Sequence, residues 1–396
     1  MKKLRLLLFS FAMVFVLPPI GSYLKWGMSP PGYGMFPAQA SNTDTRFNPP
    51  IEDPGFNQTI FNFCACVGIV ILIFLLFPRL FGFKKSVVVD PPKVKVPFPS
   101  WFWPAFVIWI ISWLLMWGRF DKLGTADHFT FVPLWWGFIF VLDGIVYRRN
   151  NGVSLISSKP VTMKIMAVAS AFSWFVFEFQ NFFVCDNWYY PNNMVLSNFG
   201  NISWQLLSYT TVLPAIFEFY WLLKTFKHMR ERYKFGPKIV LNSTMQYAAL
   251  IFGFVLLFLM GLYPFILFWV LWVSLIPALV PAMSLSKMWT PFAEISKSGD
   301  WSPVILIALA TLWNGFFWEF WNFGSEWFHD YAPTNPNYWK YSVPYIDKYH
   351  IFSEMPILGY FGYLLFGNVC WVLWVALGNI CGFNASVEAD GNIEST

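Results

Sequence analysis

The sequence predicts an all-α integral membrane protein of about ten transmembrane helices. Two observations carry this prediction. Of the 396 residues, 57% are hydrophobic and only 12% are charged, and apolar stretches of roughly 18–25 residues, each long enough for a helix to cross the hydrocarbon core, recur along the chain. Strands of a transmembrane barrel would be shorter and would alternate polar with apolar residues, which these stretches do not.

The expected helices follow one another with short loops between most of them. The seventh and eighth are divided at 262–263, because Gly261 and Pro264 favour a turn within a stretch too long for one helix. A count of eight or nine spans is the alternative. The expected spans are 6–22, 58–81, 101–118, 129–147, 164–184, 204–224, 244–262, 263–283, 302–323 and 354–382.

Basic residues gather in alternate loops, as expected of cytoplasmic loops. They precede the first span and follow the second, fourth, sixth and eighth; the densest run is "KTFKHMRERYKFGPK" at 224–238, whereas 185–203 contains no Lys or Arg. We therefore expect both termini in the cytoplasm of a bacterium, with the protein in the inner membrane. The net charge of +5 comes mostly from these loops, so it indicates membrane topology and no nucleic-acid partner.

Three segments near the ends of the chain have their own predictions. The motif "PAQA" at 37–40 resembles a signal-peptide cleavage site, but the apolar run ends near Pro18 and Pro19, so we expect the first span to be retained. Residues 23–57 are rich in Pro, Gly and Asn and are expected to lie outside the membrane. The acidic tail at 384–396 is expected to be disordered.

The chain contains a short internal repeat. The segment "FVFEFQNFF" at 175–183 matches "FFWEFWNFG" at 316–324. The corresponding polar residues are Glu178 and Asn181 in the first copy and Glu319 and Asn322 in the second. Downstream, "NWYYP" at 187–191 parallels "NYWKY" at 337–341.

This repeat predicts how the chain is divided. Two N-terminal helices (1–98) would precede a first four-helix unit (99–238) and a second one (239–383), with the tail after them. Because each unit has an even number of spans, the two units would share one orientation and be related by a pseudo-twofold axis along the membrane normal.

The repeated carboxylates are the main candidates for chemistry. Residues i and i+3 share a helix face, so Glu178 lies beside Asn181 and Glu319 beside Asn322. A charge inside the membrane costs about 2.5–3.5 kcal/mol even on lenient scales, so both pairs should point into the bundle, where we expect them to face each other. Two interpretations stay open: the pairs are hydrogen-bonded scaffolds, or the carboxylates transfer protons.

The segment 324–356 adds polar residues to the outer side of the membrane. His350 and Glu354 would be one helical turn apart if the last span begins early, and we include both in the candidate site. Glu326, His329 and Asp330 could share another face. Because neither an HExxH motif nor a clustered ligand pattern is present, we expect no metal site, and no motif indicates a particular cofactor.

Other residues admit simpler interpretations. Gly359, Gly362 and Gly367 favour close helix packing or a binding groove. Asp143, beside two arginines, is expected to form an ion pair at the membrane interface, whereas Glu218 needs an interior partner. The abundance of aromatic residues within the spans suggests walls that could bind a polyene, a quinone or an isoprenoid, or stabilise a cation.

Three stretches together resemble a family of bacterial polytopic membrane proteins of unassigned function, whose aromatic motifs are similar to "FFWEFWNF" and "EMPILGYFGYLLFG" here; the third stretch is "FTFVPLWWGFIFVLDGIVYRR". This resemblance covers about spans 3–10 and implies no activity. A fainter similarity links the chain to membrane-embedded carotenoid cyclases, which also join repeated helical units bearing Pro and Glu. Their paired carboxylates are missing, since Pro214 precedes the single Glu218.

We therefore expect an enzyme or a binding protein for a hydrophobic lipid or isoprenoid. Its polar centre would be Glu178, Asn181, Glu319 and Asn322, with His350 and Glu354 nearby. The alternatives are a proton-coupled transporter that uses the same carboxylates and a structural subunit of a membrane complex. The lipid bilayer is the expected partner, and the sequence does not indicate an oligomeric state.

Overall fold

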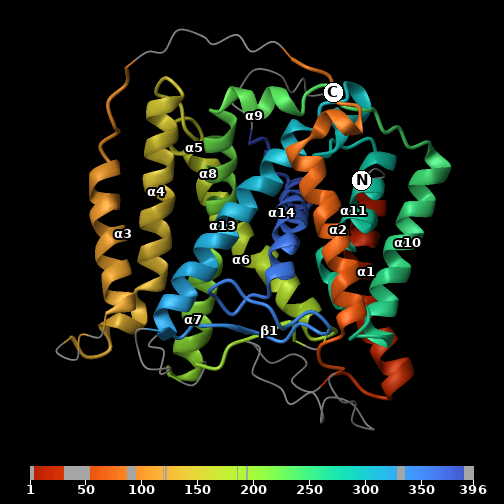
Figure 1. Ribbon diagram of the computed structural model, residues 1–396, viewed down its shortest axis with the longest axis horizontal. Helices are drawn as coiled ribbons and strands as arrows, with labels where there is room; N and C mark the ends of the chain where they lie inside the picture. Colours follow the sequence, from red (N-terminus) through yellow and green to blue (C-terminus); the bar gives the residue numbers. More distant parts are fainter. Residues whose placement is uncertain are drawn as a thin grey trace.

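The computed structural model describes residues 4–30, 54–86, 95–118, 120, 123–184, 186–192, 195–327 and 335–387. These residues form one bundle of long helices with a two-stranded ladder near one end (Figure 1). The long helices are α1 (Leu4–Trp26), α2 (Gln58–Leu76), α3 (Phe102–Trp117), α4 (Phe131–Arg149), α6 (Pro160–Asn181), α7 (Asn198–Tyr209), α8 (Val212–Lys224), α10 (Ser243–Leu262), α11 (Leu275–Leu285), α13 (Ser302–Trp327) and α14 (Tyr360–Cys381).

Shorter elements connect them. The short α-helices are α5 (Leu155–Ser158), α9 (Lys227–Arg232) and α12 (Ala293–Lys297), and the 3-10 helices are η2 (Pro78–Phe81), η4 (Ala126–Phe129), η5 (Phe268–Trp272) and η6 (Ile357–Gly359). Strand β1 (Trp188–Tyr189) pairs with β2 (Lys340–Tyr341).

The predicted membrane spans are present as helices. Within the described residues, nine helical segments are long and apolar enough to cross a membrane, and α3 is a shorter apolar helix of 16 residues. The fold class is therefore confirmed as an all-α polytopic membrane protein. The division at 262–263 is also correct, because α10 ends at Leu262 and the next helical segment begins at Phe268.

The span expected at 204–224 is broken into α7 and α8. Pro214 in the first turn of α8 has no N–H group and would clash with the carbonyl of a preceding continuous helix, which favours a break at this point. The Ser170 hydroxyl on α6 repairs the break, since it donates to the Tyr209 carbonyl and accepts from the Leu213 N–H. A single buried serine thus satisfies a backbone group on each side of the break.

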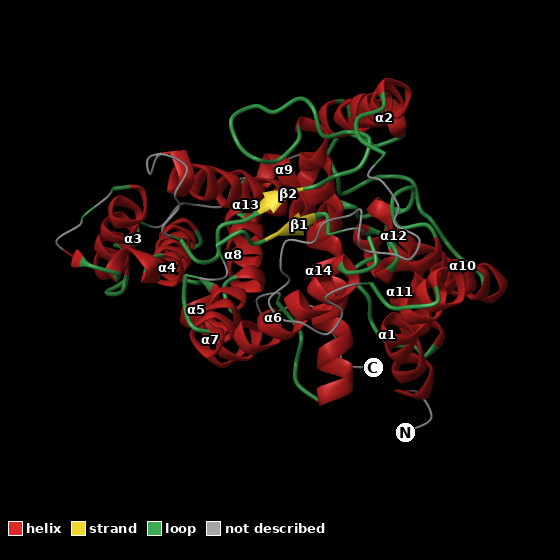
Figure 2. Ribbon diagram, turned by 90° about the horizontal axis from the view of Figure 1, so that it is seen from below, coloured by secondary structure: helices red, strands yellow, loops and turns green. Residues whose placement is uncertain are grey.

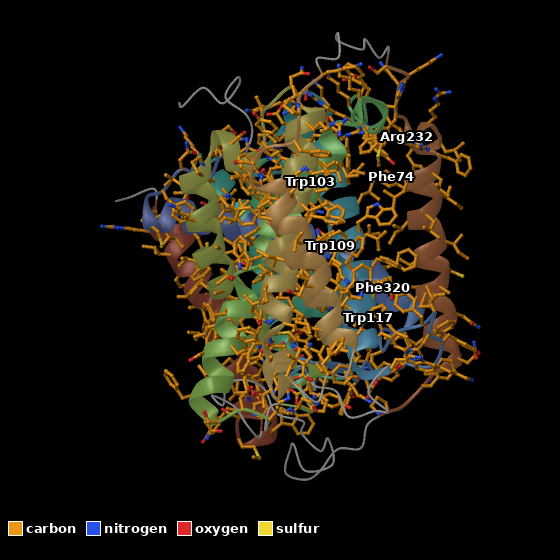
Figure 3. All side chains as sticks on the ribbon, turned by 90° about the vertical axis from the view of Figure 1, so that its left-hand side faces the viewer. Phe74, Trp103, Trp109, Trp117, Arg232 and Phe320 are labelled. Carbon is orange, nitrogen blue, oxygen red and sulfur yellow. The ribbon has the colours of Figure 1, made fainter. Side chains whose placement is uncertain are left out.

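The long helices pack in pairs. Helix α3 packs on α4, and α10 packs on α11; α6 packs on α8, and α13 packs on α14. The last four also pack across, α8 on α13 and α6 on α14, and they occupy the centre in Figure 2. Trp109, Trp113 and Trp117 of α3 contact α13, where Trp117 meets Phe320 edge to face with ring centroids 4.8 Å apart (Figure 3).

The two chain ends, α5 and the basic α9 lie toward one end of the bundle in Figure 1, and β1 and α7 lie toward the other. This arrangement agrees with the alternation of basic and non-basic loops. The assignment of the basic end to the cytoplasm stays a prediction.

Both terminal segments pack on the bundle. Helix α1 packs on α10 and α11, and the Trp26 indole N–H donates to the Gly261 carbonyl at 3.2 Å. The expected cleavage motif at 37–40 lies outside the described residues.

At the other end, Val387 is buried and its carbonyl accepts from the Trp221 indole at 2.9 Å, so 384–387 are attached to the bundle. Residues 388–396 of the expected disordered tail lie outside the described residues.

Candidate functional site: two Glu–Asn motifs at one cavity

Glu178 lies near the C-terminal end of α6 and is buried. Four donors converge on its Oε1 atom: the indole N–H groups of Trp174 at 2.8 Å and Trp188 at 3.0 Å, and the hydroxyl groups of Tyr190 at 2.5 Å and Tyr209 at 3.1 Å. Its Oε2 atom is buried without a hydrogen-bond partner. The two oxygens of this carboxyl group therefore have very different surroundings.

Glu319 on α13 has a similar arrangement with fewer donors. Its Oε1 atom accepts from the hydroxyl groups of Tyr341 at 2.6 Å and Tyr363 at 2.8 Å, and its Oε2 atom is also buried without a partner. The Tyr341 hydroxyl in turn accepts from the Trp339 indole at 2.9 Å. Both carboxyl groups are thus held through one oxygen by tyrosines of their own half of the chain.

The asparagine of each motif holds the backbone two residues before one of these tyrosines, Tyr190 or Tyr341. The Asn181 side-chain N–H donates to the Trp188 carbonyl, and the Asn322 side-chain N–H donates to the Trp339 carbonyl, both at 2.8 Å. Asn322 also accepts from the Trp339 N–H at 3.1 Å. Each Glu–Asn pair therefore uses one helix face to hold an aromatic side chain and a strand backbone together.

The two motifs meet through their strands rather than through their carboxyl groups. In the antiparallel ladder, Trp188 lies opposite Tyr341 and Tyr189 lies opposite Lys340. This register is symmetric. A twofold rotation of the ladder that places Trp188 on Trp339 also places Tyr341 on Tyr190, so the pair Trp188–Tyr341 maps onto the equivalent pair Trp339–Tyr190. The matched hydrogen bonds and the register support the predicted repeat at the site, while the division into the units 99–238 and 239–383 stays a prediction.

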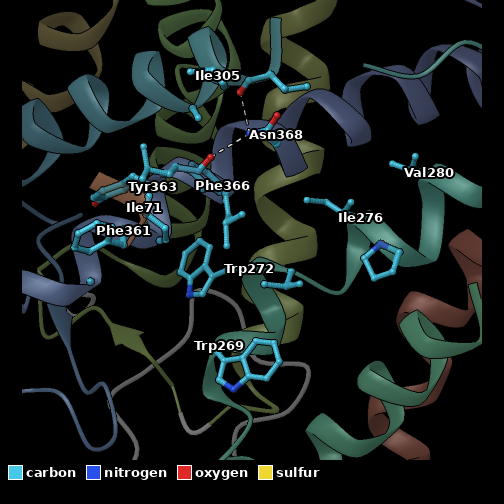
Figure 4. A pocket seen from close by; sticks show the side chains of 18 of the residues that line it. Ile71, Trp269, Trp272, Ile276, Val280, Ile305, Phe361, Tyr363, Phe366 and Asn368 are labelled. Atoms are coloured by element: carbon cyan, nitrogen blue, oxygen red, sulfur yellow. Dashed lines mark hydrogen bonds between the residues drawn. The ribbon is translucent and has the colours of Figure 1, made fainter. Parts of the chain in front are cut away.

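A cavity of about 1240 Å³ extends along these motifs. Its wall is mostly apolar and aromatic, with Trp269 and Trp272, Ile276 of α11 and Phe361 and Phe366 of α14 around it (Figure 4). All four tyrosines that bind the two glutamates line it: Tyr190, Tyr209, Tyr341 and Tyr363. A single cavity therefore contacts the hydrogen-bond partners of both carboxyl groups.

Helix α2 forms the outer wall of this cavity and presents its other face to the outside of the bundle. It is attached at its ends: the Asn57 N–H donates to the Tyr345 carbonyl at 3.0 Å, and the Tyr233 hydroxyl donates to the Leu75 carbonyl at 2.7 Å. Near this second attachment, Phe74 and Arg232 lie at the same end of the helix (Figure 3). Its cavity-lining residues are Phe63, Cys64, Val67, Gly68, Ile71, Phe74 and Leu75.

Glu354 belongs to a separate polar cluster. The Tyr338 hydroxyl donates to Glu326 at 2.5 Å and to Glu354 at 3.2 Å, and the Lys340 ammonium lies 3.0 Å from Glu326. Burial, together with the Glu326 carboxylate, raises the pKa of Glu354, although Lys340 opposes the shift. Burial and the bonded Glu326 likewise raise the pKa of Tyr338.

His350 is exposed and does not share a helix face with Glu354. Residues 350–356 are not helical, because the last helical segment begins only at Ile357. The His350 ring lies 2.9 Å from the Asp347 carboxylate and 3.1 Å from the Ser353 carbonyl. His329 and Asp330 lie outside the described residues. Among the described residues, no group of three or more His, Cys, Asp and Glu side chains could hold a metal ion.

The expected interfacial ion pair of Asp143 is wrong. Asp143 is fully buried and accepts from the Trp101 indole at 3.1 Å, the Ser154 hydroxyl at 2.9 Å and the Ile156 N–H at 2.9 Å. Sequence proximity to two arginines suggested the pair, but the helix turns Asp143 inward, beside the buried Glu218.

The tyrosines and tryptophans that bind the two glutamates were missed by the sequence interpretation. A usable signal was present, because Trp188 and Tyr190 match Trp339 and Tyr341 in a shared W-x-Y pattern after each motif. Reading that pattern as hydrogen-bond donors would have required knowing that the loops fold back toward the helix ends.

The fold and the site define a polytopic all-α integral membrane protein with a large aromatic cavity beside two buried Glu–Asn motifs. No protein-family model, curated protein or solved structure matches the chain.

Proposed function

We propose that the protein binds a hydrophobic lipid or isoprenoid in this cavity and acts on it by acid–base chemistry. The observation that carries the proposal is the contact of one apolar cavity with the tyrosine partners of both buried glutamates. Ligand sites typically combine an apolar lining with a few convergent polar groups. The volume of about 1240 Å³ is above the range of about 300–1,000 Å³ common for drug-sized ligands, which suits a long-chain lipid.

The carboxyl groups and tyrosines would give and take protons. Each Oε2 atom has no partner and can carry a proton, while Oε1 is held by tyrosine hydroxyls that also line the cavity. A tyrosine hydroxyl that turns from the carboxyl group to the ligand gives its proton to a C=C bond, which forms a C–H bond from the π electron pair and leaves a carbocation. The tyrosine then regains a proton from the carboxyl group. Loss of a neighbouring proton by the reverse route restores the carboxyl group and yields an isomerised or cyclised product without a redox partner.

The aromatic wall would stabilise such a cation. Trp174, Trp188 and Trp272 lie beside one another, with ring centroids 5.6 to 5.8 Å apart, and they line the cavity near the tyrosines. Aromatic faces attract cations most strongly where water is absent. The similarity to carotenoid cyclases, although faint, is compatible with the same class of ligand.

A proton-coupled transporter or a structural subunit would use the same pairs differently. A transporter needs an aqueous path from the carboxyl groups to both sides, whereas the cavity wall is mostly apolar. A purely structural role explains the hydrogen bonds of Glu178 and Glu319 but requires no cavity beside them. These considerations favour the enzyme.

Lipid analysis tests the proposal. A strain lacking the gene would be complemented with the wild-type chain, with Glu319→Gln or with Glu178→Gln, and total lipid extracts would be compared by mass spectrometry. The matched control is Glu294→Gln, an exposed carboxylate near Lys297 on the opposite side of the membrane. We expect the deletion and the two site variants, but not the control, to accumulate the same unprocessed lipid.

The outcomes separate an enzyme from a scaffold. Unchanged lipids at normal protein abundance would remove the enzyme hypothesis. If the glutamine variants fail to accumulate, Gly362→Phe provides a second test, because an added Cβ at Gly362, in the cavity wall, meets no atom within 4 Å. A folded Gly362→Phe protein with unchanged lipids would leave a scaffold role for the pairs.

We also propose that the basic end of the bundle lies in the cytoplasm of a bacterial inner membrane, with both termini there. The clustering of the chain ends with α9 at that end supports this orientation. A reporter fused to the C-terminus that is active only in the cytoplasm should be active, and one active only outside the inner membrane should be silent.

A further inference from the structure

We infer that the ligand of the cavity is an uncharged lipid whose polar end is a hydroxyl group, bound by the amides of Asn187, Gln205 and Asn337. This inference rests on the proposed function and names the chemical class of the ligand.

The wall of the cavity carries no formal charge. Among the described residues that line it there is no Lys, Arg, His, Asp or Glu. A phosphate or diphosphate group placed there would lose its hydration without gaining a cation, which is costly in an apolar environment. Phosphate sites in proteins commonly use Arg or Lys side chains. Phospholipids and polyprenyl phosphates are therefore poor ligands for this cavity.

The charged cluster next to Tyr341 does not change this conclusion. Lys340 precedes Tyr341, which lines the cavity, but its ammonium group is 3.0 Å from the Glu326 carboxylate and it is absent from the cavity wall. The Glu354 carboxylate also interacts electrostatically with this ammonium group. The positive charge of Lys340 is thus already balanced by carboxylates.

Three amide side chains in the cavity wall have polar atoms without a partner. Asn187, Gln205 and Asn337 all line the cavity and are almost completely buried. The side-chain oxygens of Asn187 and Asn337 have no partner, and neither polar atom of Gln205 has one. Leaving a buried polar atom without a partner costs about 1–3 kcal/mol, so three such residues in the wall of one cavity favour a ligand group that satisfies them.

The available atoms include both acceptors and donors. The Asn187 side-chain N–H already donates to the Phe268 carbonyl at 2.9 Å, and that of Asn337 donates to the Ser208 hydroxyl. The hydroxyl hydrogens of Tyr190 and Tyr341 are directed to Glu178 and Glu319, which leaves their oxygens as acceptors. Asn187 and Asn337 each keep a second N–H, and Gln205 keeps both of its N–H groups. A carbonyl or an ether can only accept from these groups, whereas a hydroxyl group can also donate to the unpartnered oxygens, so it matches this set better.

Binding of matched probes to the purified full-length protein in lipid nanodiscs tests the inference. The probes share one C20 isoprenoid chain and end in a hydroxyl, a methyl ether or a phosphate; bound probe is measured by native mass spectrometry with tryptophan fluorescence as a second readout. We expect the alcohol to bind roughly five- to tenfold more tightly than the ether, as the loss of one hydrogen bond predicts, and the phosphate to bind least.

A pair of variants assigns the effect to the amides. Gln205→Met keeps a similar length without polar atoms and should reduce the preference for alcohol over ether. Gln246→Met is the control, because Gln246 also lines the cavity but belongs to the start of α10 and already donates to the Leu241 carbonyl. That variant should keep the preference.

Each result decides a different claim. Phosphate binding as tight as alcohol binding would overturn the inference and leave the proposed lipid function intact. Equal binding of ether and alcohol would overturn the hydroxyl assignment alone. Binding of none of the three probes would count against the proposed function itself. These comparisons use the unaltered protein, so they stand even if Gln205→Met does not fold.

Discussion

Trp188 lies opposite Tyr341 in the ladder of β1 and β2, so a residue that binds Glu178 and a residue that binds Glu319 are paired backbone to backbone. The two acidic motifs are 141 residues apart in the sequence, from 178 to 319, yet this short ladder joins the segments that hold them. Any shift of one strand would change the hydrogen bonds of both carboxyl groups. The ladder therefore couples the two halves of the site.

The asparagines that hold this ladder should matter for stability in both halves. Asn181→Ala removes a donor from the Trp188 carbonyl, and Asn322→Ala removes two hydrogen bonds with Trp339. We expect each change to lower the free energy of unfolding by about 1–3 kcal/mol, more for Asn322. Reversible unfolding in mixed detergent, followed by tryptophan fluorescence, measures both.

A third asparagine serves as the control for this pair. The Asn379 side chain on α14 donates only to the Val375 carbonyl one turn earlier in its own helix. Asn379→Ala should therefore change stability by less than either site variant. A loss equal to that of Asn322→Ala would mean that amide removal, rather than the strand contact, causes the effect.

The membrane spans could be predicted from the sequence because the bilayer fixes the apolar length of each helix. The burial of Glu178 and Glu319 followed from the same argument, since a charge inside the membrane must find partners. The partners themselves could not be predicted. Tyr190 and Tyr341 come from loops that fold back onto the bundle, and two-residue strands leave no periodic pattern.

Helix α2 is a second case in which the sequence predicted a span but not its surroundings. Its apolar composition predicted a span at 58–81, and a helix is present there. Composition does not report whether a span packs inside the bundle or forms a wall beside a cavity, because lipid and protein interior are equally apolar. The cavity, and hence the amides of Gln205 and Asn337 as ligand groups, required the arrangement in space.

The tyrosine hydroxyls should contribute unequally to the two sites. Tyr341→Phe removes one of two hydrogen bonds on Glu319 and also an acceptor of the Trp339 indole. Tyr209→Phe leaves three of the four bonds on Glu178. Hydrogen bonds to charged groups are worth about 1.5–3 kcal/mol, so we expect a loss in that range for Tyr341→Phe and a smaller one for Tyr209→Phe.

Unfolding in mixed detergent measures this difference, with Tyr247→Phe as the control for the loss of an exposed hydroxyl on α10. Equal losses for the Tyr341 and Tyr209 variants would show that the number of donors on each carboxyl group does not govern stability.

Two glycines of α14 should respond to alanine with opposite signs. A Cβ atom at Gly367 would contact the Thr311 hydroxyl and lie 2.8 Å from the Ile307 carbonyl, so α13 and α14 would have to separate. We expect Gly367→Ala to cost about 1–3 kcal/mol of stability. A Cβ atom added at Gly362 has no neighbouring atom within 4 Å. We therefore expect Gly362→Ala to be neutral or to stabilise the protein by up to about 1 kcal/mol, because alanine has a higher helix propensity than glycine. Destabilisation by both changes would argue against close packing at Gly367 as the specific cause.

Stability should decrease as pH rises through the titration of Glu354. Burial and the Glu326 carboxylate raise the pKa of Glu354 above its usual value, which is about 4.3 for an unperturbed glutamate. The folded protein therefore binds this proton more tightly than the unfolded chain does. The stabilising contribution is complete below the usual pKa and is lost as pH rises through the raised pKa.

Glu354→Gln should make the free energy of unfolding less dependent on pH in this window and should raise stability at pH values above the window. The control Glu294→Gln, at an exposed pair with Lys297, should keep the wild-type profile, and an unchanged slope in Glu354→Gln would assign the pH dependence to other groups.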